Sequence, residues 1–124
     1  MNPLTRTVKS VIGAVLMLLV FTTSATAQEK AAEGALAVSA KMKEMLSLNE
    51  QQYNKVLEVN KVYLRKIAAA KKDGLTTAEM DKKLRVYSNE RENKLKSVLT
   101  PSQYKTYAAR RESVQDMLKK YYED

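Results

Sequence analysis

The amino-acid sequence predicts an all-α fold, and three observations lead to this prediction. No segment alternates apolar and polar residues in the way a half-buried strand does. The chain contains only three glycines and two prolines, so few helix breakers interrupt it. A six-residue helix-start pattern also occurs three times. We expect four helices that form long antiparallel hairpins in a thin, open arrangement, and we expect this arrangement to dimerise.

Each copy of the helix-start pattern has a leucine, then a capping residue, then a glutamine or glutamate three positions later. The three copies are Leu48, Asn49 and Gln52; Leu75, Thr76 and Glu79; and Leu99, Thr100 and Gln103. The asparagine or threonine side chain accepts a hydrogen bond from the amide three residues on. The glutamine or glutamate side chain accepts one from the amide of the capping residue. We therefore expect a helix to begin directly after each capping residue.

The first 27 residues have the three regions of a secretory signal peptide. Arg6 and Lys9 provide a positively charged start, and residues 11–21 are an apolar run. Residues 25–27 form a small-residue cleavage site, so cleavage is expected before Gln28 and the mature protein is expected in the periplasm. An uncleaved membrane anchor is the alternative, but the apolar run is well short of the roughly 20 residues needed to span a bilayer.

Removal of the signal peptide leaves 97 residues, which is enough for one small domain. We expect a flexible lead-in over residues 28–34 and a single all-helical domain over residues 35–124. A short helix over residues 35–46 opens this domain. Loss of Arg6 and Lys9 lowers the net charge from +8 to +6, so the mature chain stays basic.

The helix-start patterns place the remaining helices. The second helix is expected over residues 50–72, where apolar side chains recur at steps of three and four. It ends before Gly74, because glycine suits the left-handed position that follows a helix. The third helix is expected over residues 77–98. The fourth is expected over residues 101–121 and begins with Pro101, whose missing amide costs nothing at the first helical position.

Two arginines interrupt the apolar faces of the last two helices. Arg91 and Arg111 lie near the middle of these faces, and a closed bundle would have to bury and pair their charges. An open arrangement avoids that cost. Tyrosine has an apolar ring and a polar hydroxyl, and it suits the rim of a groove better than a dry centre. Five of the seven tyrosines lie on the apolar faces: Tyr53, Tyr63, Tyr87, Tyr104 and Tyr107.

The composition argues against catalysis and against bound cofactors. The chain has no cysteine and no histidine, so the usual zinc, haem and thiol sites cannot form. Carboxylate pairs such as Glu90 and Glu92 lie on different faces of a helix and form no catalytic group. We expect no enzyme activity, no metal and no cofactor. The pI of 9.6 would suit nucleic acid, but export argues against that partner.

Two of the helix-start patterns carry a family resemblance. Residues 99–103 read Leu-Thr-Pro-Ser-Gln, and residues 48–52 repeat the pattern with Asn49 in place of threonine. Two such motifs in a short, exported, basic chain resemble the LTxxQ-motif family of periplasmic proteins, the Spy and CpxP group. The resemblance spans essentially the whole mature chain. It implies a four-helix, cradle-shaped homodimer that acts as an ATP-independent chaperone or as an accessory regulator of an envelope-stress sensor kinase.

A basic segment of the second helix is the leading candidate for a binding surface. Residues 59–72 contain no acid, and Lys61 and Arg65 lie one turn apart. Such a surface would attract acidic, partly unfolded proteins and hold them by weak apolar contacts, whereas the alternative is a solvated helix face. The candidate client-binding residues are Lys61, Tyr63, Arg65, Lys66, Tyr87, Arg91 and Arg111. Four methionines have two possible interpretations, as an adaptable binding surface or as ordinary residues of the hydrophobic core: Met42, Met45, Met80 and Met117.

The leading functional hypothesis is a periplasmic, ATP-independent chaperone or envelope-stress protein that works as a homodimer. Its expected partners are unfolded or partly folded envelope proteins and a second copy of the chain, because thin helical layers of this length bury little apolar area alone. The second hypothesis is an accessory regulator that docks on the periplasmic domain of a sensor kinase. The third is a small structural envelope protein bound to anionic lipid or polysaccharide.

Overall fold

The computed structural model describes residues 27–123, and this range is helical apart from short connections. An N-terminal helix covers residues 27–46, and it is followed by α2 (Glu50–Lys71), α3 (Thr77–Val98), α4 (Pro101–Ala109) and α5 (Arg111–Lys119). Since no residue between 27 and 123 belongs to a strand, the predicted all-α class is confirmed. The predicted signal peptide lies outside the described residues, except for Ala27.

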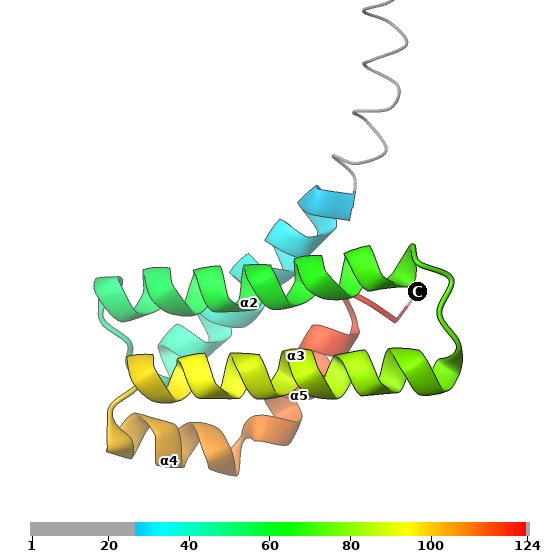
Figure 1. Ribbon diagram of the computed structural model, residues 1–124. Coiled ribbons are helices and arrows are strands. Elements are labelled where there is room, and N and C mark those ends of the chain that lie inside the picture. The colour runs from blue at the N-terminus through cyan, green and yellow to red at the C-terminus, as the bar shows by residue number, and fades with distance from the viewer. Residues whose placement is uncertain (1–26, 124) are drawn as a thin grey trace, which may run out of the picture.

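The helices form two layers (Figure 1). The antiparallel hairpin of α2 and α3 is one layer, and the N-terminal helix and α5 lie behind it. Asn60 of α2 donates from Nδ2 to Ser39 Oγ of the N-terminal helix over 2.9 Å. Gln115 of α5 donates from Nε2 to the Tyr63 hydroxyl of α2 over 3.1 Å. Both bonds join the rear layer to α2.

The hydrophobic core lies between these two layers. Each helix turns its apolar stripe inward, as the spacing of three and four residues predicts. The most deeply buried side chains come from all five helices: Val38, Met42, Val56, Ile67, Leu95, Tyr107, Val114 and Leu118. Met42 is therefore a core residue. The other three methionines singled out above are partly buried and pack against the core.

All three predicted capping boxes are present. In the first, the backbone N–H of Gln52 donates to Asn49 Oδ1 over 2.8 Å. The other two boxes repeat this bond over 3.2 and 3.1 Å, and each box also has its return bond to the amide of the capping residue. Gly74 has a φ of +63° and occupies the left-handed position predicted for it. The three helix starts are thus confirmed.

The N-terminal helix is longer than the sequence predicted. Residues 28–34, which we expected to be a flexible lead-in, continue this helix, and Ala31 is buried. Gly34 lies inside the helix as a point of close contact. A Cβ atom at Gly34 would lie 2.6 Å from Tyr121 Cγ and 2.9 Å from Leu64 Cδ1. The glycine therefore allows the C-terminal segment to pack directly on the helix backbone.

The predicted fourth helix is two helices. It breaks at Arg110, whose φ of −113° and ψ of 12° lie outside the helical region. The Arg110 amide donates to the Tyr107 carbonyl over 2.9 Å and so closes α4 with a tight final turn. The change of direction lets Val114 and Leu118 of α5 reach the core. Among residues 27–123, no helix is both long and apolar enough to cross a membrane.

Candidate binding surface

The glutamines of the two motifs join the beginnings of α2 and α4. Gln52 Nε2 donates to Gln103 Oε1 over 2.6 Å, and Gln103 Nε2 donates to Gln52 Oε1 over 3.2 Å. Each Oε1 also accepts the amide of its own capping residue, from Asn49 over 3.1 Å and from Thr100 over 2.9 Å. Each glutamine therefore completes its own capping box and also binds the other box.

The same two side chains bind the ends of the preceding helices. Gln103 Nε2 donates to the carbonyl of Leu46, the last residue of the N-terminal helix, over 3.3 Å. Gln52 Nε2 donates to the carbonyl of Val98, the last residue of α3, over 3.2 Å. Carbonyl groups at helix ends have no partner within their own helix. The glutamine pair thus joins four helix ends at one end of the hairpin.

The capping box of α3 stands at the opposite end of the hairpin. Glu79 accepts hydrogen bonds from the Thr76 hydroxyl over 2.8 Å and from the Thr76 amide over 3.2 Å, and these bonds lower the pKa of the Glu79 carboxyl. No residue of α3 before Arg91 is buried. Toward the Gly74 end, α3 is therefore only partly buried, through side chains such as Met80 and Leu84 that pack against the core.

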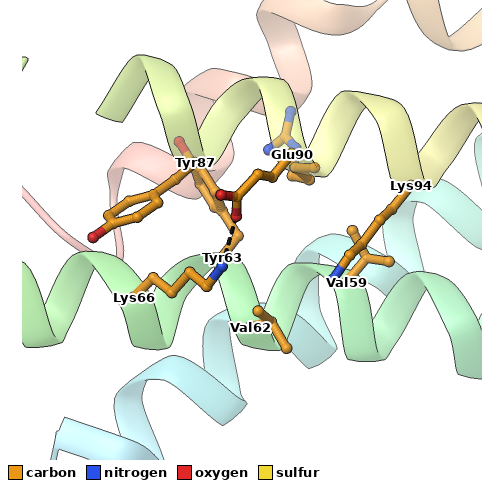
Figure 2. A pocket seen from close by; sticks show the side chains of 8 residues that line it. Val59, Val62, Tyr63, Lys66, Tyr87, Glu90 and Lys94 are labelled. Carbon is orange, nitrogen blue, oxygen red and sulfur yellow. Dashed lines mark hydrogen bonds and ion pairs between the residues drawn. The ribbon is translucent and has the colours of Figure 1, made fainter. Parts of the chain in front are cut away.

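A groove made of two neighbouring hollows follows the seam between α2 and α3, and Figure 2 shows the side chains that line the smaller hollow. Its larger part is a hollow of about 280 Å³. The residues that line this hollow are Lys55, Glu58, Val59, Val62, Lys94, Ser97 and Val98. A cavity of about 10 Å³ adjoins it and shares Val59, Val62 and Lys94 with it. We call the two parts together the seam groove. Its lining combines apolar valines with four cationic side chains and two carboxylates, those of Glu58 and Glu90.

Charged side chains from both helices border the small cavity. Lys66 Nζ of α2 and Glu90 Oε2 of α3 form an ion pair over 2.6 Å across the seam (Figure 2). Lys66 Nζ also lies 5.7 Å from the centroid of the Tyr87 ring. The two paired side chains are 41% and 44% exposed, so their ion pair is worth about 0–1 kcal/mol. Breaking this ion pair to let Lys66 bind another partner therefore costs little free energy.

Arg91 also lines the small cavity, and it is only 3% exposed. Its guanidinium carbon lies 4.9 Å from the centroid of the Tyr63 ring, and its Nη2 donates to the Tyr107 hydroxyl over 2.9 Å. The expectation that an open arrangement spares Arg91 from burial is wrong, because these aromatic partners offset part of the cost. Tyr63 and Tyr107 are buried as well, since their hydroxyls find partners inside the protein.

Glu92 ties α3 to the two C-terminal helices. Its carboxylate accepts hydrogen bonds from the Tyr107 hydroxyl over 2.7 Å, from the Tyr104 hydroxyl over 3.3 Å and from Arg111 Nε over 2.5 Å. Burial raises the pKa of Tyr107 to about 12; the charge of Arg91 opposes this rise and the bond to Glu92 adds to it. Arg111 is thus exposed and paired with Glu92.

The structure brings four of the seven predicted client-binding residues to the small cavity: Tyr63, Lys66, Tyr87 and Arg91. Because Tyr63 and Arg91 are buried, the accessible members are Lys66 and Tyr87. The other three lie elsewhere. Lys61 is half-buried, Arg65 borders a hollow beside the start of the N-terminal helix, and Arg111 binds Glu92.

The sequence analysis missed the valines and Lys94. Val59 and Val62 stand three positions apart on α2, and Lys94 and Val98 stand four apart on α3, so each pair shares one helix face. Val59 is a core residue and Val98 packs against the core, whereas Val62 lies outside the core cluster. These side chains border a groove only because α2 pairs with α3, and helical periodicity does not specify that pairing.

The fold and the groove define a small all-α protein with an amphipathic surface along its longest hairpin. Between residues 27 and 123, no three acidic, cysteine or histidine side chains are grouped to hold a metal ion. Residues 22–107 match the family described as Domain of unknown function (DUF4890), and the chain belongs to this family. No curated protein and no solved structure matches the chain.

Proposed function

We propose that this protein is an exported, ATP-independent chaperone that binds partly unfolded envelope proteins in the seam groove. The observation that carries the proposal is the composition of this groove. Val62 and Val98 are half-buried and provide apolar contact above the buried Val59, and the charged side chains beside them are Lys55, Lys94 and Glu58. Lysines attract acidic segments over a distance, and apolar contacts then hold the segment.

The dimensions of the groove favour weak binding. A hollow of about 280 Å³ lies just below the size range of pockets that enclose small molecules, and it admits only a few side chains of a client. Burial of one apolar side chain contributes about 1.5–3 kcal/mol, so two such contacts, at about 3–6 kcal/mol, correspond to a Kd of roughly tens of micromolar to several millimolar. Such an affinity allows a client to leave the groove and fold.

The sequence features support the same role. The predicted signal peptide would deliver the protein to the periplasm, and the paired motifs resemble those of the LTxxQ-motif family, which includes periplasmic chaperones. The glutamine pair gives these motifs a structural purpose, because it fixes the end of the hairpin that carries the groove. A sensor-kinase regulator is the alternative, and recovery of one stoichiometric partner from crosslinked cells would favour it over a chaperone.

A homodimer is part of the proposal. The part of α3 before Arg91 buries no residue, and its Val86 is 49% exposed. A second copy that packs on this segment would remove apolar surface from water and complete the cradle implied by the family resemblance. Analytical ultracentrifugation of the chain from Gln28 onward tests this part, and a monomer at all concentrations would refute it.

Suppression of aggregation tests the chaperone role. Light scattering from a chemically denatured client is followed with the parent protein and with two double variants of equal charge change. The seam variant combines Val62→Asp with Lys94→Glu, and the control combines Leu36→Asp with Lys105→Glu at exposed positions outside the groove. We expect the parent and the control to suppress scattering and the seam variant to lose most of this effect. No suppression by the parent would refute the proposal.

A further inference from the structure

The last two turns of α2 carry positive charge that lies outside the seam groove. Arg65 and Lys72 stand seven positions apart, which is about two helical turns, so they share one face of the helix. Two alanines at steps of three and four stand between them, Ala68 and Ala69. All four residues border a hollow of about 340 Å³. The other residues that line this hollow are Ala27, Gln28 and Asp73.

A second hollow, of about 250 Å³, adjoins the first and extends the positive charge to other helices. It shares Ala27, Ala68 and Lys72 with the first hollow. Its remaining lining residues are Lys30, Ala31, Leu64, Lys71, Tyr121 and Tyr122. We call the two hollows together the basic surface. Four of its lining side chains are cationic and one is a carboxylate, so it is complementary to an anionic partner.

Two of these cations are available to a partner. Arg65 and Lys72 are exposed, and their side chains form no hydrogen bond or ion pair within residues 27–123. Lys71 is engaged, because its Nζ donates to the Tyr122 carbonyl and so holds the C-terminal segment against α2. Arg65 and Lys72 therefore keep their full charge for a molecule that approaches from outside.

The basic surface lies where the described part of the chain begins. Ala27 lines both hollows, and Figure 1 shows the N-terminal helix, in blue at its start, beside α2. Only five residues separate Ala27 from the apolar run of residues 11–21. Such a run directs a chain to a membrane. While the run is attached, the basic surface is therefore the part of the described protein that follows the membrane segment most closely.

We infer that the basic surface binds a lipid bilayer that carries anionic phosphate headgroups. Each lysine or arginine beside such a bilayer strengthens binding about fivefold, because its charge lies in the negative surface potential. The half-buried Tyr121 supports the same partner, since a ring with a polar hydroxyl suits the boundary between water and lipid. This inference goes beyond the proposed function, because its surface and its partner both differ from those of the seam groove.

The apolar content of the basic surface favours a bilayer over an acidic protein segment. The side chains between Arg65 and Lys72 are alanines, whereas Leu64 and Tyr122 are buried. An acidic peptide would thus gain little apolar contact in addition to charge. A bilayer presents many headgroups at once, so several cations on one face are enough for weak, salt-sensitive binding.

Vesicle flotation tests the inference with the chain from Gln28 onward, which contains every described residue except Ala27. One set of vesicles contains equal parts of phosphatidylglycerol and phosphatidylcholine, and the other contains phosphatidylcholine alone. We expect the protein to float with the anionic vesicles at low salt, to be released at high salt and not to float with the neutral vesicles. Absence of binding to the anionic vesicles, or equal binding to both sets, would overturn the inference.

Two double variants of equal charge change locate the binding. The surface variant combines Arg65→Gln with Lys72→Gln, and the control combines Lys105→Gln with Arg110→Gln at exposed positions of α4 and its C-cap. Circular dichroism shows whether both variants keep the helical fold. We expect the surface variant to bind anionic vesicles roughly 20-fold more weakly than the parent, and the control only a few-fold more weakly. Equal weakening by the two variants would overturn the assignment to the basic surface.

A blocked pentaglutamate peptide distinguishes a bilayer from an acidic protein. At equal concentrations of negative charge, we expect the peptide to leave the protein on the vesicles. Displacement of the protein by the peptide would assign the basic surface to an acidic protein and overturn the inference. These measurements contain no aggregating client, so the bilayer site and the chaperone role can fail independently.

Discussion

The side-chain amides of Gln52 and Gln103 hydrogen-bond to each other in both directions across 51 positions of sequence. Each amide also completes the capping box of its own helix and binds the carbonyl end of another. Two local helix-start motifs thus become one tertiary contact. This contact sets the end of the hairpin from which the seam groove extends.

The glutamine pair is expected to stabilise the fold more than an ordinary cap does. Gln103→Ala removes the return bond of its own box, the bonds to Gln52 and the bond to Leu46, so we expect a loss of about 2–3 kcal/mol. Glu79→Ala is the matched control, because its box stands alone, and we expect a smaller loss of stability from it. Urea unfolding followed by circular dichroism measures both. Equal losses would show that the pair adds nothing to capping.

Gly74 is required because of its backbone conformation, and not because a side chain at this position would clash with neighbouring atoms. A Cβ atom at Gly74 would meet nothing within 4 Å, but the φ of +63° is unfavourable for other residues. We expect Gly74→Ala to lower the free energy of unfolding by about 1 kcal/mol and Gly74→Asn to lower it by less, since asparagine tolerates this region. Thermal unfolding of the two variants checks the order. A stabilising Gly74→Ala would contradict it.

Gly34 and Tyr121 are expected to be energetically coupled. In the parent, Gly34→Ala improves helix propensity by up to about 1 kcal/mol but forces its Cβ against the Tyr121 ring. We expect this substitution to destabilise the parent and to be less harmful when Tyr121→Ala has removed the ring. A double-mutant cycle should give a coupling energy of about 0.5–3 kcal/mol. Additive effects would mean that the ring does not press on the glycine.

Tyr107 makes the fold sensitive to high pH. Its pKa is raised from 10.0 to about 12, so between these values the folded state keeps a proton that the unfolded state loses. The stabilisation is complete below pH 10 and decreases as the pH rises toward about 12. We expect the free energy of unfolding to fall less steeply over this range in Tyr107→Phe than in the parent. Parallel pH profiles of the two proteins would contradict this assignment.

Local sequence signals account for the parts of the fold that were predicted. The capping boxes, Pro101 and Gly74 each act within a few residues, and the structure has each helix start where these signals place it. The break at Arg110 follows from the packing of α5 on the core, and no glycine or proline marks it. The prediction of a flexible lead-in over residues 28–34 was wrong for a related reason, because Gly34 contacts Tyr121, which is distant in sequence.

The candidate site was predicted only in part. Lys66 and Tyr87 were identified from charge and aromatic pattern, and they do border the seam groove. Arg91 was expected to stay near solvent. Its burial was not foreseen because its two aromatic neighbours come from α2 and α4, and the pattern of α3 alone does not reveal them. Of the valines in the groove, Val59 is in the core and Val98 packs against it, whereas Val62 lies outside the core cluster. The pattern of a single helix gives no sign that Val62 faces another helix. The remaining residues of the site are therefore identified by the pairing of helices in the tertiary structure and not by the periodicity of the sequence.

Site-specific photocrosslinking tests the seam groove most directly. A photoreactive residue is placed at Val62, inside the groove, or at Leu36, an apolar side chain that is 50% exposed on the N-terminal helix. Each protein is mixed with a denatured client and illuminated. We expect strong client crosslinks from position 62 and few from position 36. Crosslinks of equal strength from both positions, or from position 36 alone, would contradict the seam groove as the binding surface.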